Sequence, residues 1–352
     1  MGGSCVSVRV DVVAGRSDVA GLSGEFRDLA DAEPTRVSSR WESVWPYLLH
    51  RPWLEPVAVR ARRGSATNAL ALVAVERRHG VWRIHKPGAR GEPFGLLHDN
   101  VEHLQAVARR LRLTLDELPG PWVMRLPGLS PNAPEADALA DVMPTSVDER
   151  VFAAPRLDVS SRQTLNSVLT RNTRSATAKA ENRIKADGLT CRSTWLSDAE
   201  SIEKYLPQIV AVRDERNLSL GRQEPDPAEV LTFQDTIRAH TRDGRTRLLV
   251  FEIEDQVAAY AVGFLDDDEI WIYSNSVSPR YLHYSAGTIA NAEVVRASLA
   301  CPQLQYVNWG AGVQRYKMSG PVTLQWMHMF SAWSSPALRS LASAARRVRL
   351  LR

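Results

Sequence analysis

Apolar and polar residues alternate over several short segments in the second half of the chain, and this period of two predicts strands. A polar loop containing Ser278 and Pro279 follows the third of them, and the pattern then changes to that of a helix. The predicted elements are strands at Thr246–Ile253, Val257–Phe264 and Glu269–Ser274, a helix from about Thr288 to Leu299, and a strand at Leu304–Trp309.

The first half repeats this order of elements without clear residue identity. Its predicted elements are strands at Glu55–Arg62, Ala69–Arg77 and Val81–His85, a helix near Val101–Leu111, and a strand at Trp122–Leu126. The order strand-strand-strand-helix-strand thus occurs in both halves. Two copies of one α/β unit fit that order better than one large sheet does.

A strongly basic helix is predicted between the two repeats, from Gln163 to Asp187, with Asp187–Gly188 as its C-terminal cap. Two further helices are predicted at Asp198–Asn217 and Pro227–Arg242. The polar face of the basic helix carries Arg171, Arg174, Lys179, Arg183 and Lys185.

The proline-rich stretch from Leu126 to Pro155 is typical of a connection between domains. The Ala-, Arg- and Leu-rich tail from Ala337 is either a basic amphipathic helix or a frayed end. A length of 352 residues suits two domains. We expect an N-terminal domain over residues 1–155, a C-terminal domain over 156–336 and a basic tail over 337–352.

The composition is ordinary for a globular protein, with 44% hydrophobic and 24% charged residues. No apolar run is long enough to cross a bilayer, and the first residues lack the features of a secretion signal. The cysteines Cys5, Cys191 and Cys301 are too scattered to indicate a metal site or a disulfide framework. We therefore expect a cytoplasmic protein with no membrane partner and no metal.

Basic residues gather in separate parts of the chain, although the net charge is only +4. They outnumber acidic residues over 51–90 and 156–192, and the last fourteen residues hold five arginines and no acid. This distribution suits a polyanion such as CoA or tRNA, or it marks the solvated faces of an arginine-rich protein. The acidic run Asp266–Glu269 is expected at a solvated hairpin tip, because adjacent carboxylates do not converge on a metal.

Four segments of the second half stand in a characteristic order. They are the basic run Leu165–Arg174, the strand and loop Ile270–Tyr281 (Ile-Trp-Ile-Tyr-Ser-Asn-Ser-Val-Ser-Pro-Arg-Tyr), the turn Tyr284–Ile289 (Tyr-Ser-Ala-Gly-Thr-Ile) and the run Tyr306–Lys317 (Tyr-Val-Asn-Trp-Gly-Ala-Gly-Val-Gln-Arg-Tyr-Lys). In this order they resemble the second domain of CelD-like and FemABX-like members of the GNAT superfamily of acyltransferases. The first half, with Trp41–Trp45 near its start, is similar to the degenerate first repeat of the same proteins.

The resemblance implies an α/β (α+β) fold of two tandem GNAT-like domains, each a mixed, mostly antiparallel sheet flanked by helices. The chain departs from the family pattern at three places. Asn308 stands where an acidic residue is usual, Ala311–Gly312 replaces Arg-Gly, and Ala286 replaces the proline of a Ser-Pro-Gly turn. The first change puts in doubt any role that needs a carboxylate at the end of the late strand.

The resemblance also implies that the turn before the later helix binds the phosphates of an acyl donor at the helix N-terminus. Gly287 lets the backbone approach an anion, and Ser285 and Thr288 offer hydroxyl groups. An ordinary helix start with a serine cap fits the same residues. The basic residues assigned to the donor are Arg171, Arg174 and Arg315.

Direct acylation needs an unprotonated amine, a positioned carbonyl and a stabilised oxyanion, but no covalent enzyme intermediate. The resemblance places the pair Tyr316–Lys317 at the reacting centre, where Lys317 would stabilise the oxyanion or hold a donor phosphate; otherwise it is a surface lysine. His283 is a candidate base, although a lone histidine is more often structural. The candidates for the acceptor pocket are Tyr273, Asn275, Asn308 and Trp309, of which Tyr273 and Trp309 equally fit a core.

Two donors agree with the resemblance, and neither is a tightly bound cofactor. We favour aminoacyl-tRNA, because the glycine-rich phosphate loop of CoA users is reduced to Ala286–Thr288 and basic stretches lie in both halves. The predicted function is therefore aminoacyl transfer onto an amine acceptor. A small-molecule amine of natural-product biosynthesis, a peptidoglycan precursor and a polysaccharide amine all fit as that acceptor. An acyl-CoA-dependent N-acetyltransferase acting on a small-molecule or sugar amine is the alternative. A non-catalytic GNAT-like binding module is the alternative from another class.

Overall fold

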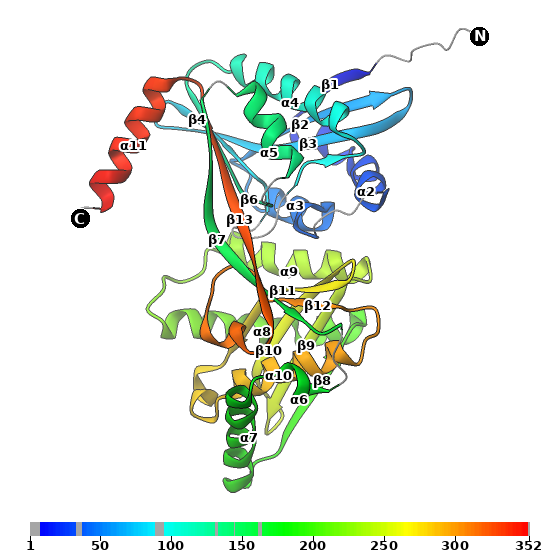
Figure 1. Cartoon of the computed structure of the whole chain (residues 1–352), viewed down its shortest axis with the longest axis vertical. Helices are drawn as coiled ribbons and strands as arrows, with labels where there is room; N and C mark the ends of the chain where they lie inside the picture. Colours follow the sequence, from blue (N-terminus) through cyan, green and yellow to red (C-terminus); the bar gives the residue numbers. More distant parts are fainter. Residues whose placement is uncertain are drawn as a thin grey trace. The chain divides into compact units, whose positions relative to one another are not determined.

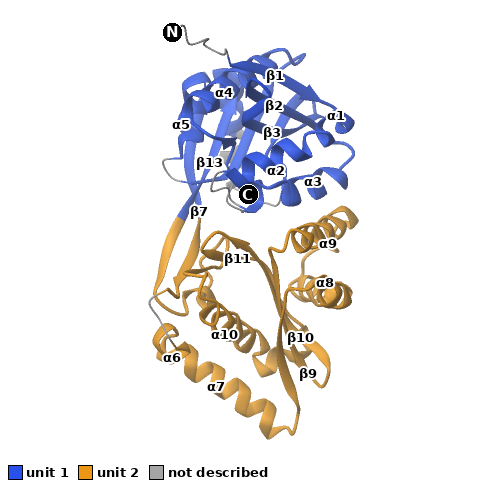
Figure 2. Ribbon diagram, turned by 90° about the vertical axis from the view of Figure 1, so that its right-hand side faces the viewer, with its two compact units in different colours: residues 1–152, 326–352 blue, residues 153–325 orange. Residues whose placement is uncertain are grey.

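The computed structural model describes residues 8–32, 37–88, 95–130, 133–143, 145–160 and 164–350, with the backbone alone for 345–350. The chain divides into two compact units, one of residues 1–152 with 326–352 and the other of residues 153–325 (Figures 1 and 2). The chain passes into the second unit within β7 (Ser146–Asp158) and leaves it within β13 (Val322–Trp333). Two sequence expectations, Cys5 and the helix start at Gln163, lie outside the described residues.

The first unit is built on a mostly antiparallel sheet in which only β4 and β6 run parallel. Its strand order is β1 (Arg9–Ala14), β2 (Glu55–Arg63), β3 (Ala66–Arg78), β4 (Val81–His85), β6 (Trp122–Leu129) and β13, with the short β5 (Leu97–His98) beside β3.

Helices cover both faces of this sheet, because its central strand β3 is apolar at successive positions. Ala71 and Val73 pack on the face of α4 (Val101–Asp116) and α5 (Pro134–Val142). Leu70 and Leu72 pack on the opposite face, against α1 (Arg16–Ala20), α2 (Ser23–Ala32) and α3 (Trp41–Leu49). The alternation follows from the period of two in a strand.

The second unit holds a sheet in which β11 and β12 pair in parallel and the other neighbours pair antiparallel. Its order is β7, β12 (Tyr306–Asn308), β11 (Glu269–Val277), β10 (Gln256–Asp266), β9 (Thr246–Ile253) and β8 (Cys191–Leu196). Figure 2 shows helices α8 (Ala199–Ser219) and α9 (Pro227–Arg242) on one face of the sheet, and α7 (Arg171–Ala186) and α10 (Ala286–Leu299) on the other. The short elements are α6 (Leu165–Val168) and the 3₁₀ turns η1 (Val37–Ser39), η2 (Pro279–Tyr284) and η3 (Arg315–Met318).

The structure confirms the repeated order predicted from the sequence: β2-β3-β4-α4-β6 in the first unit and β9-β10-β11-α10-β12 in the second. The helices predicted to start at Asp198 and Pro227 are also present, with Asp198 as the N-cap of α8. The fold class is thus the mixed α/β arrangement that we expected.

Several other expectations were wrong. The predicted basic helix is two helices, because Thr164 and Thr170 each cap a new N-terminus with their side chains. The proline-rich stretch does contain the passage between the units, but it is regular structure and not a linker: it holds the end of β6, α5 with Pro134 in its first turn, and β7. The tail, by contrast, forms the helix α11 (Pro336–Leu350), which is one of the two alternatives given for it, and it groups with the first unit.

The acidic run between β10 and β11 is also less exposed than expected. Asp266 and Glu269 are buried, and the Glu269 carboxylate accepts a hydrogen bond of 2.6 Å from Arg156 Nε. Asp268 contacts the same guanidinium at 3.3 Å. An arginine contributed by β7 therefore compensates the buried Glu269 carboxylate, which the local sequence does not indicate.

Candidate functional site

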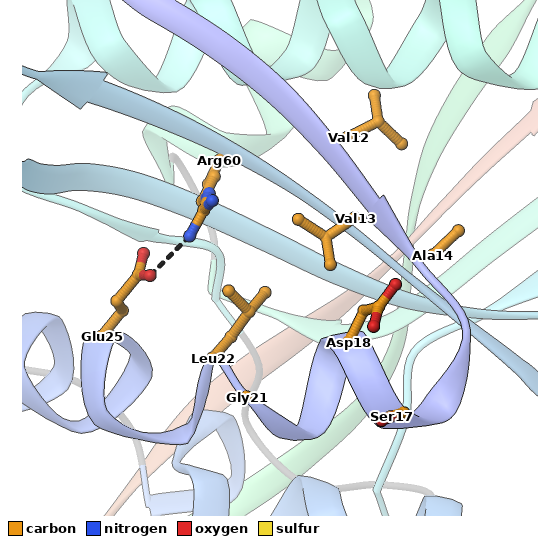
Figure 3. Close-up of a pocket in the computed structure, with 9 residues that line it drawn as sticks. All are labelled: Val12, Val13, Ala14, Ser17, Asp18, Gly21, Leu22, Glu25 and Arg60. Carbon is orange, nitrogen blue, oxygen red and sulfur yellow. Dashed lines mark hydrogen bonds and ion pairs between the residues drawn. The ribbon is translucent and has the colours of Figure 1, made fainter.

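A surface hollow of about 580 Å³ lies in the first unit, between β1 and the helices α1 and α2 (Figure 3). Glu25 and Arg60 form an ion pair within it, and Glu25 also accepts a hydrogen bond from Thr67. These charges are already compensated, and none of the predicted site residues lines the hollow. The candidate site is therefore built from the second unit, where those residues lie.

The central feature of that unit is a strand edge that its neighbour leaves open. β12 pairs with β11 only from Glu269 to Trp271, whereas β11 continues to Val277 along β10. Within the described part of the chain, no strand pairs with residues 272–277 on the β12 side. We call these six residues the open edge; at about 3.3 Å per residue it is about 20 Å long. Its backbone can pair with an extended ligand as a further strand would.

A β-bulge lies within the open edge. Ile272 pairs with Gly263 and Ser274 pairs with Val262, so Tyr273 is the extra residue. The ring of Tyr273 stacks on Phe233 of α9 with centroids 5.6 Å apart and lies 4.9 Å from Phe264. Tyr273 was expected either in the acceptor pocket or in the core. Its side chain is half-buried in an aromatic cluster, and its backbone belongs to the open edge.

The bulge reverses which face the following side chains occupy. Ser274 accepts or donates a hydrogen bond of 2.9 Å with Tyr260 on β10. Asn275 turns toward α10, where its amide donates to Asn291 Oδ1 at 3.2 Å. Without the extra residue, a strict period of two would place Asn275 on the face of Tyr273. The bulge therefore brings Asn275 to α10.

The far end of the open edge meets the N-terminus of α10. A Cβ on Gly287 would lie 3.6 Å from Val277 Cβ, so the first helical turn packs on the last residue of the edge. Ser285 precedes the helix in the left-handed region, with φ of 55°, and its side chain makes no capping bond. The amides at the start of α10 and the free Ser285 hydroxyl suit an anion. Gly287 has no positive φ, and its role is this ordinary contact.

The other end of the site is formed by η3. The phenol of Tyr316 donates a hydrogen bond of 3.3 Å to Asn275 Oδ1 on the open edge. Its ring stands edge-on to Trp309 at 6.3 Å between centroids. Burial raises the pKa of Tyr316, so the phenol stays protonated at neutral pH and can act as a donor. Asn291, Asn275 and Tyr316 thus form one hydrogen-bonded chain from α10 to η3.

Lys317 follows Tyr316 in η3 and is only 5% exposed. The alternative that it is a surface lysine is therefore excluded. Its Nζ donates to the carbonyl oxygens of Gly310 at 3.2 Å and of Ala311 at 2.6 Å. Burial lowers its pKa from 10.5 to about 8. Both carbonyls belong to the loop that follows β12, so the contacts of Lys317 hold that loop in place.

Asn308 and Trp309 are both buried at the end of β12. The Asn308 amide donates to Glu269 at 3.2 Å and to Gln325 at 3.3 Å, and its Oδ1 accepts from the Gly310 amide at 3.1 Å. Asn308 therefore anchors the same loop as Lys317, and its polar atoms are already used. Trp309 packs in the core beneath α10, while its indole nitrogen has no partner among the described residues.

His283 lies apart from Tyr316 and Lys317 in the contacts that the structure records. Its exposed ring packs at 3.9 Å on Tyr284, and its backbone carbonyl accepts from Arg183 of α7. It lines a hollow of about 440 Å³ with Arg280, Tyr281 and the β9–β10 turn. No recorded contact brings it to the open edge, so a role as base stays a prediction.

The basic residues assigned to the donor lie on α7 and η3. The side chains of Arg171 and Arg315 are exposed, and Arg174 is half-buried. Within the described residues, none of the five basic side chains of α7 forms an ion pair, and Arg183 contacts only a carbonyl. Helix α7 packs beside α10 and therefore presents uncompensated positive charge near the donor end of the site.

The structure thus brings together Tyr316, Asn275, Lys317 and Trp309 at one end and Ser285, Gly287 and Thr288 at the other. The sequence missed two contributors, the backbone of the open edge and Asn291. A polar Asn291 between the apolar Ala290 and Ala292 was a signal that could have found the second. No group of His, Cys, Asp or Glu that could hold a metal occurs among the described residues. None of the described helices is both long and apolar enough to cross a membrane.

Comparison with known proteins agrees with the geometry. Residues 171–318 match the acetyltransferase (GNAT) domain family, and this range contains the open edge, α10 and η3. No curated protein sequence matches the chain.

Three solved structures share the fold over nearly the whole chain. FemX has 9% identity and a TM-score of 0.64, covering 91% of this chain and 98% of its own. The C-terminal domain of a putative lysylphosphatidylglycerol synthetase from Agrobacterium fabrum has 11% identity and a TM-score of 0.60, covering 94% and 96%. A tandem GNAT protein from the clavulanic acid biosynthesis pathway has 13% identity and a TM-score of 0.50, covering 93% and 99%. These likenesses confirm the tandem GNAT-like fold expected from the sequence.

Proposed function

We propose that this chain, in which residues 171–318 match the acetyltransferase (GNAT) domain family, transfers an aminoacyl group from aminoacyl-tRNA to a small-molecule amine. The observation that carries the proposal is the open edge, which ends at the N-terminus of α10. An extended anionic donor can place its phosphate at the helix start and its acyl end along the strand.

The reaction is a direct displacement at the ester carbonyl. The neutral amine attacks the carbonyl carbon, a C–N bond forms, and the bond from that carbon to the ribose oxygen breaks. The amine loses one proton, and the ribose oxygen gains one, so an ester becomes an amide. Tyr316 is the proposed hydrogen-bond donor to the developing oxygen charge, because its phenol reaches the open edge and stays protonated. Its single O–H would turn from Asn275 Oδ1 to the substrate oxygen for this step.

Lys317 acts on the position of Tyr316 through the preceding loop. Its hydrogen bonds to Gly310 and Ala311 fix the loop that precedes Tyr316, and the phenol must stand within a few tenths of an ångström of its position to act. We therefore propose a positioning role for Lys317 in place of direct contact with the donor. Asn308 would act in the same way through the Gly310 amide.

The choice of tRNA as donor rests on α7. Its basic side chains are spread over the whole helix and form no ion pair within the described part of the chain, and the helix packs beside α10. A polyanion longer than one cofactor would use this surface, and its affinity would fall steeply with salt. Two of the structural likenesses carry names of aminoacyl-transferring proteins, FemX and lysylphosphatidylglycerol synthetase, and they support the same choice.

The second candidate is an acyl-CoA-dependent N-acetyltransferase. The family match is to an acetyltransferase domain, and the start of α10 with Ser285 suits a pyrophosphate as well as a nucleic-acid phosphate. In that case the acyl chain of the thioester would lie on the open edge and a thiolate would leave. The chemistry at the carbonyl and the role of Tyr316 would be the same.

Donor titration tests the proposal. The purified chain is titrated with acetyl-CoA, with bulk aminoacylated tRNA and with the same tRNA deacylated, each at two salt concentrations. Salt-sensitive binding of tRNA, tighter when it is aminoacylated, without saturable CoA binding is the expected result. Saturable binding of acetyl-CoA with weak tRNA binding would contradict it and establish the second candidate.

A variant separates an enzyme from a non-catalytic binding module. Tyr316→Phe removes one hydroxyl from a partly exposed ring and leaves the packing intact, whereas Lys317→Ala also perturbs the loop. An enzyme should lose transfer rate in both variants with donor affinity retained in the first. If neither variant changes the yield of acylated amine, the unit does not catalyse the transfer through this site.

A further inference from the structure

Helix α8 carries an arginine whose guanidinium is only partly used. Arg213 Nε donates to Asp214 Oδ1 at 3.0 Å, and the two side chains form an ion pair. The Nη2 atom of the same guanidinium is buried and has no hydrogen-bond partner within the described part of the chain. A buried N–H group without an acceptor is costly, because it has lost its water. Arg213 has no part in the transfer proposed above, so its free N–H groups are available to a ligand.

Packing holds this guanidinium in one orientation. Its Cζ lies over the ring of Phe233 on α9, 4.3 Å from the ring centroid. The ion pair with Asp214 fixes the Nε side of the group. The Arg213 side chain is still 16% exposed, so a small ligand can reach it. A planar guanidinium held in this way is suited to the two oxygens of a carboxylate.

Two independent contacts place Arg213 beside the open edge. Phe233, on which it stacks, is itself stacked on Tyr273 of that edge, with centroids 5.6 Å apart. Burial raises the pKa of Tyr260 on β10 to about 12, while a hydrogen bond with Ser274 and the charge of Arg213 lower it. The Tyr260 hydroxyl lies 2.9 Å from the hydroxyl of Ser274, a residue of the open edge. An anion bound by Arg213 would therefore lie next to the strand along which the acyl group is proposed to extend.

We propose that Arg213 binds a carboxylate of the acceptor, so that the acceptor is an amino acid and not a simple amine. This inference rests on the proposed function and names the class of its acceptor. The Arg213–Asp214 pair is already neutral, and a zwitterionic amino acid adds no net charge to it. A phosphate group would instead bring up to two further negative charges beside Asp214. The ammonium group of the amino acid loses one proton to solvent before the neutral amine attacks.

Acceptors that differ only in the carboxylate test the proposal. Glycine, β-alanine and γ-aminobutyrate are compared with their primary amides, with aminoacyl-tRNA and acetyl-CoA as donors in separate reactions. A nearby carboxylate stabilises an ammonium group, so the amides hold at least as much neutral amine and would react faster if the carboxylate made no contact. The wild type should instead use at least one of the acids about ten- to a hundredfold better than its amide, measured as kcat/KM.

Arg213→Gln should remove this preference, lowering kcat/KM for the acid about ten- to a hundredfold and leaving that for the amide within about twofold. Arg213→Lys keeps the charge without the planar fork and should restore only part of the preference. Lys204→Gln removes the same charge from an exposed position on the same helix and should behave like the wild type. Equal loss for acid and amide in Arg213→Gln would show that Arg213 only supports the fold. A preference for phosphoethanolamine over ethanolamine that depends on Arg213, with none for the acids, would make the bound group a phosphate.

The thermal midpoint, measured without any donor, separates this inference from the proposed function. A ligand that binds the folded protein raises the midpoint. At least one acid at millimolar concentration should raise the midpoint of the wild type and of Lys204→Gln but not that of Arg213→Gln. If none of the acids raises the midpoint of the wild type, the amino-acid site is overturned, even where transfer to other amines occurs. A midpoint shift without transfer from either donor would overturn the proposed function and leave Arg213 as an amino-acid site.

Discussion

Burial of Lys317 lowers its pKa, and the free energy of unfolding should therefore depend on pH. Its Nζ contacts two carbonyls, and none of the described carboxylates pairs with it. A neutral amine keeps two N–H donors, which are enough for both carbonyls. Loss of the proton therefore costs no hydrogen bond and relieves the burial of a charge, in agreement with the lowering of its pKa from 10.5 to about 8.

The sign of the effect follows from proton binding. Between pH 8 and 10.5 the unfolded chain holds a proton on Lys317 that the folded protein has released. The free energy of unfolding therefore rises with pH across this window. The two pKa values correspond to about 3 kcal/mol over the whole window, of which about 1 kcal/mol is gained between pH 7 and pH 9.

Urea unfolding of the wild type and of Lys317→Met at pH 7, 8 and 9 measures this contribution. Methionine has nearly the length of lysine and does not titrate, so the difference in unfolding free energy between the two proteins isolates Lys317. The wild type should gain about 1 kcal/mol relative to the variant from pH 7 to pH 9. Lys179→Met, on the exposed face of α7, is the control and should show no such change. Parallel curves for the wild type and Lys317→Met would refute the reasoning.

Three further outcomes are expected. Gly263→Ala should lower the free energy of unfolding by about 1–3 kcal/mol in chemical denaturation, because the new Cβ would lie 2.7 Å from the Ile270 side chain beside the bulge. Glu269→Ala should cost about 3–5 kcal/mol, since it leaves Arg156 and a buried amide without their main partner; a loss below 1 kcal/mol would mean that the ion pair is solvated. Tyr316→Phe should reduce the transfer rate on the order of ten- to a hundredfold in single-turnover assays while the thermal midpoint stays within about 2 °C.

The alternation of apolar and polar residues was enough to predict the repeated order of strands and helices. Each of those strands packs one or both of its faces against a hydrophobic core, and the pattern reflects this burial. The basic stretch was different. Its composition favours one long helix, but the two threonines at 164 and 170 cap separate helices, and capping by side chains decided the result. β7 was missed because the surrounding stretch is rich in proline and suggests a linker. Pro155 is the one proline within the strand, and its carbonyl still accepts a hydrogen bond from the Trp309 amide.

The candidate site was predictable in its residues more than in its geometry. Resemblance brought Tyr316, Lys317 and Ser285 into view. The structure places the Tyr316 phenol at Asn275 within the open edge, and Ser285 at the start of the helix that packs on Val277 at the end of that edge. Burial of Lys317 and Asn308 could not be read from the sequence, because their partners are backbone carbonyls and a glutamate 39 positions away. The open edge consists of backbone groups and exists because β12 ends before β11 does. No pattern of side chains in the sequence indicates where that pairing stops.

These contacts give the substitution at Asn308 a physical meaning. An acidic residue there would face Glu269 across 3.2 Å and would repel it, whereas the amide donates to Glu269 and still accepts from Gly310. The Gly310 backbone must approach the Ile272 carbonyl so closely that a Cβ would lie 3.2 Å from it, and its φ of 67° also favours glycine. Asn308 accepts from the amide of Gly310 and Lys317 donates to its carbonyl, so both side chains hold the loop that precedes Tyr316. The replacement of the family's acidic residue by Asn308 is therefore no argument against catalysis by this unit. Asn308 holds the loop before Tyr316, the residue that we propose as hydrogen-bond donor in the transfer.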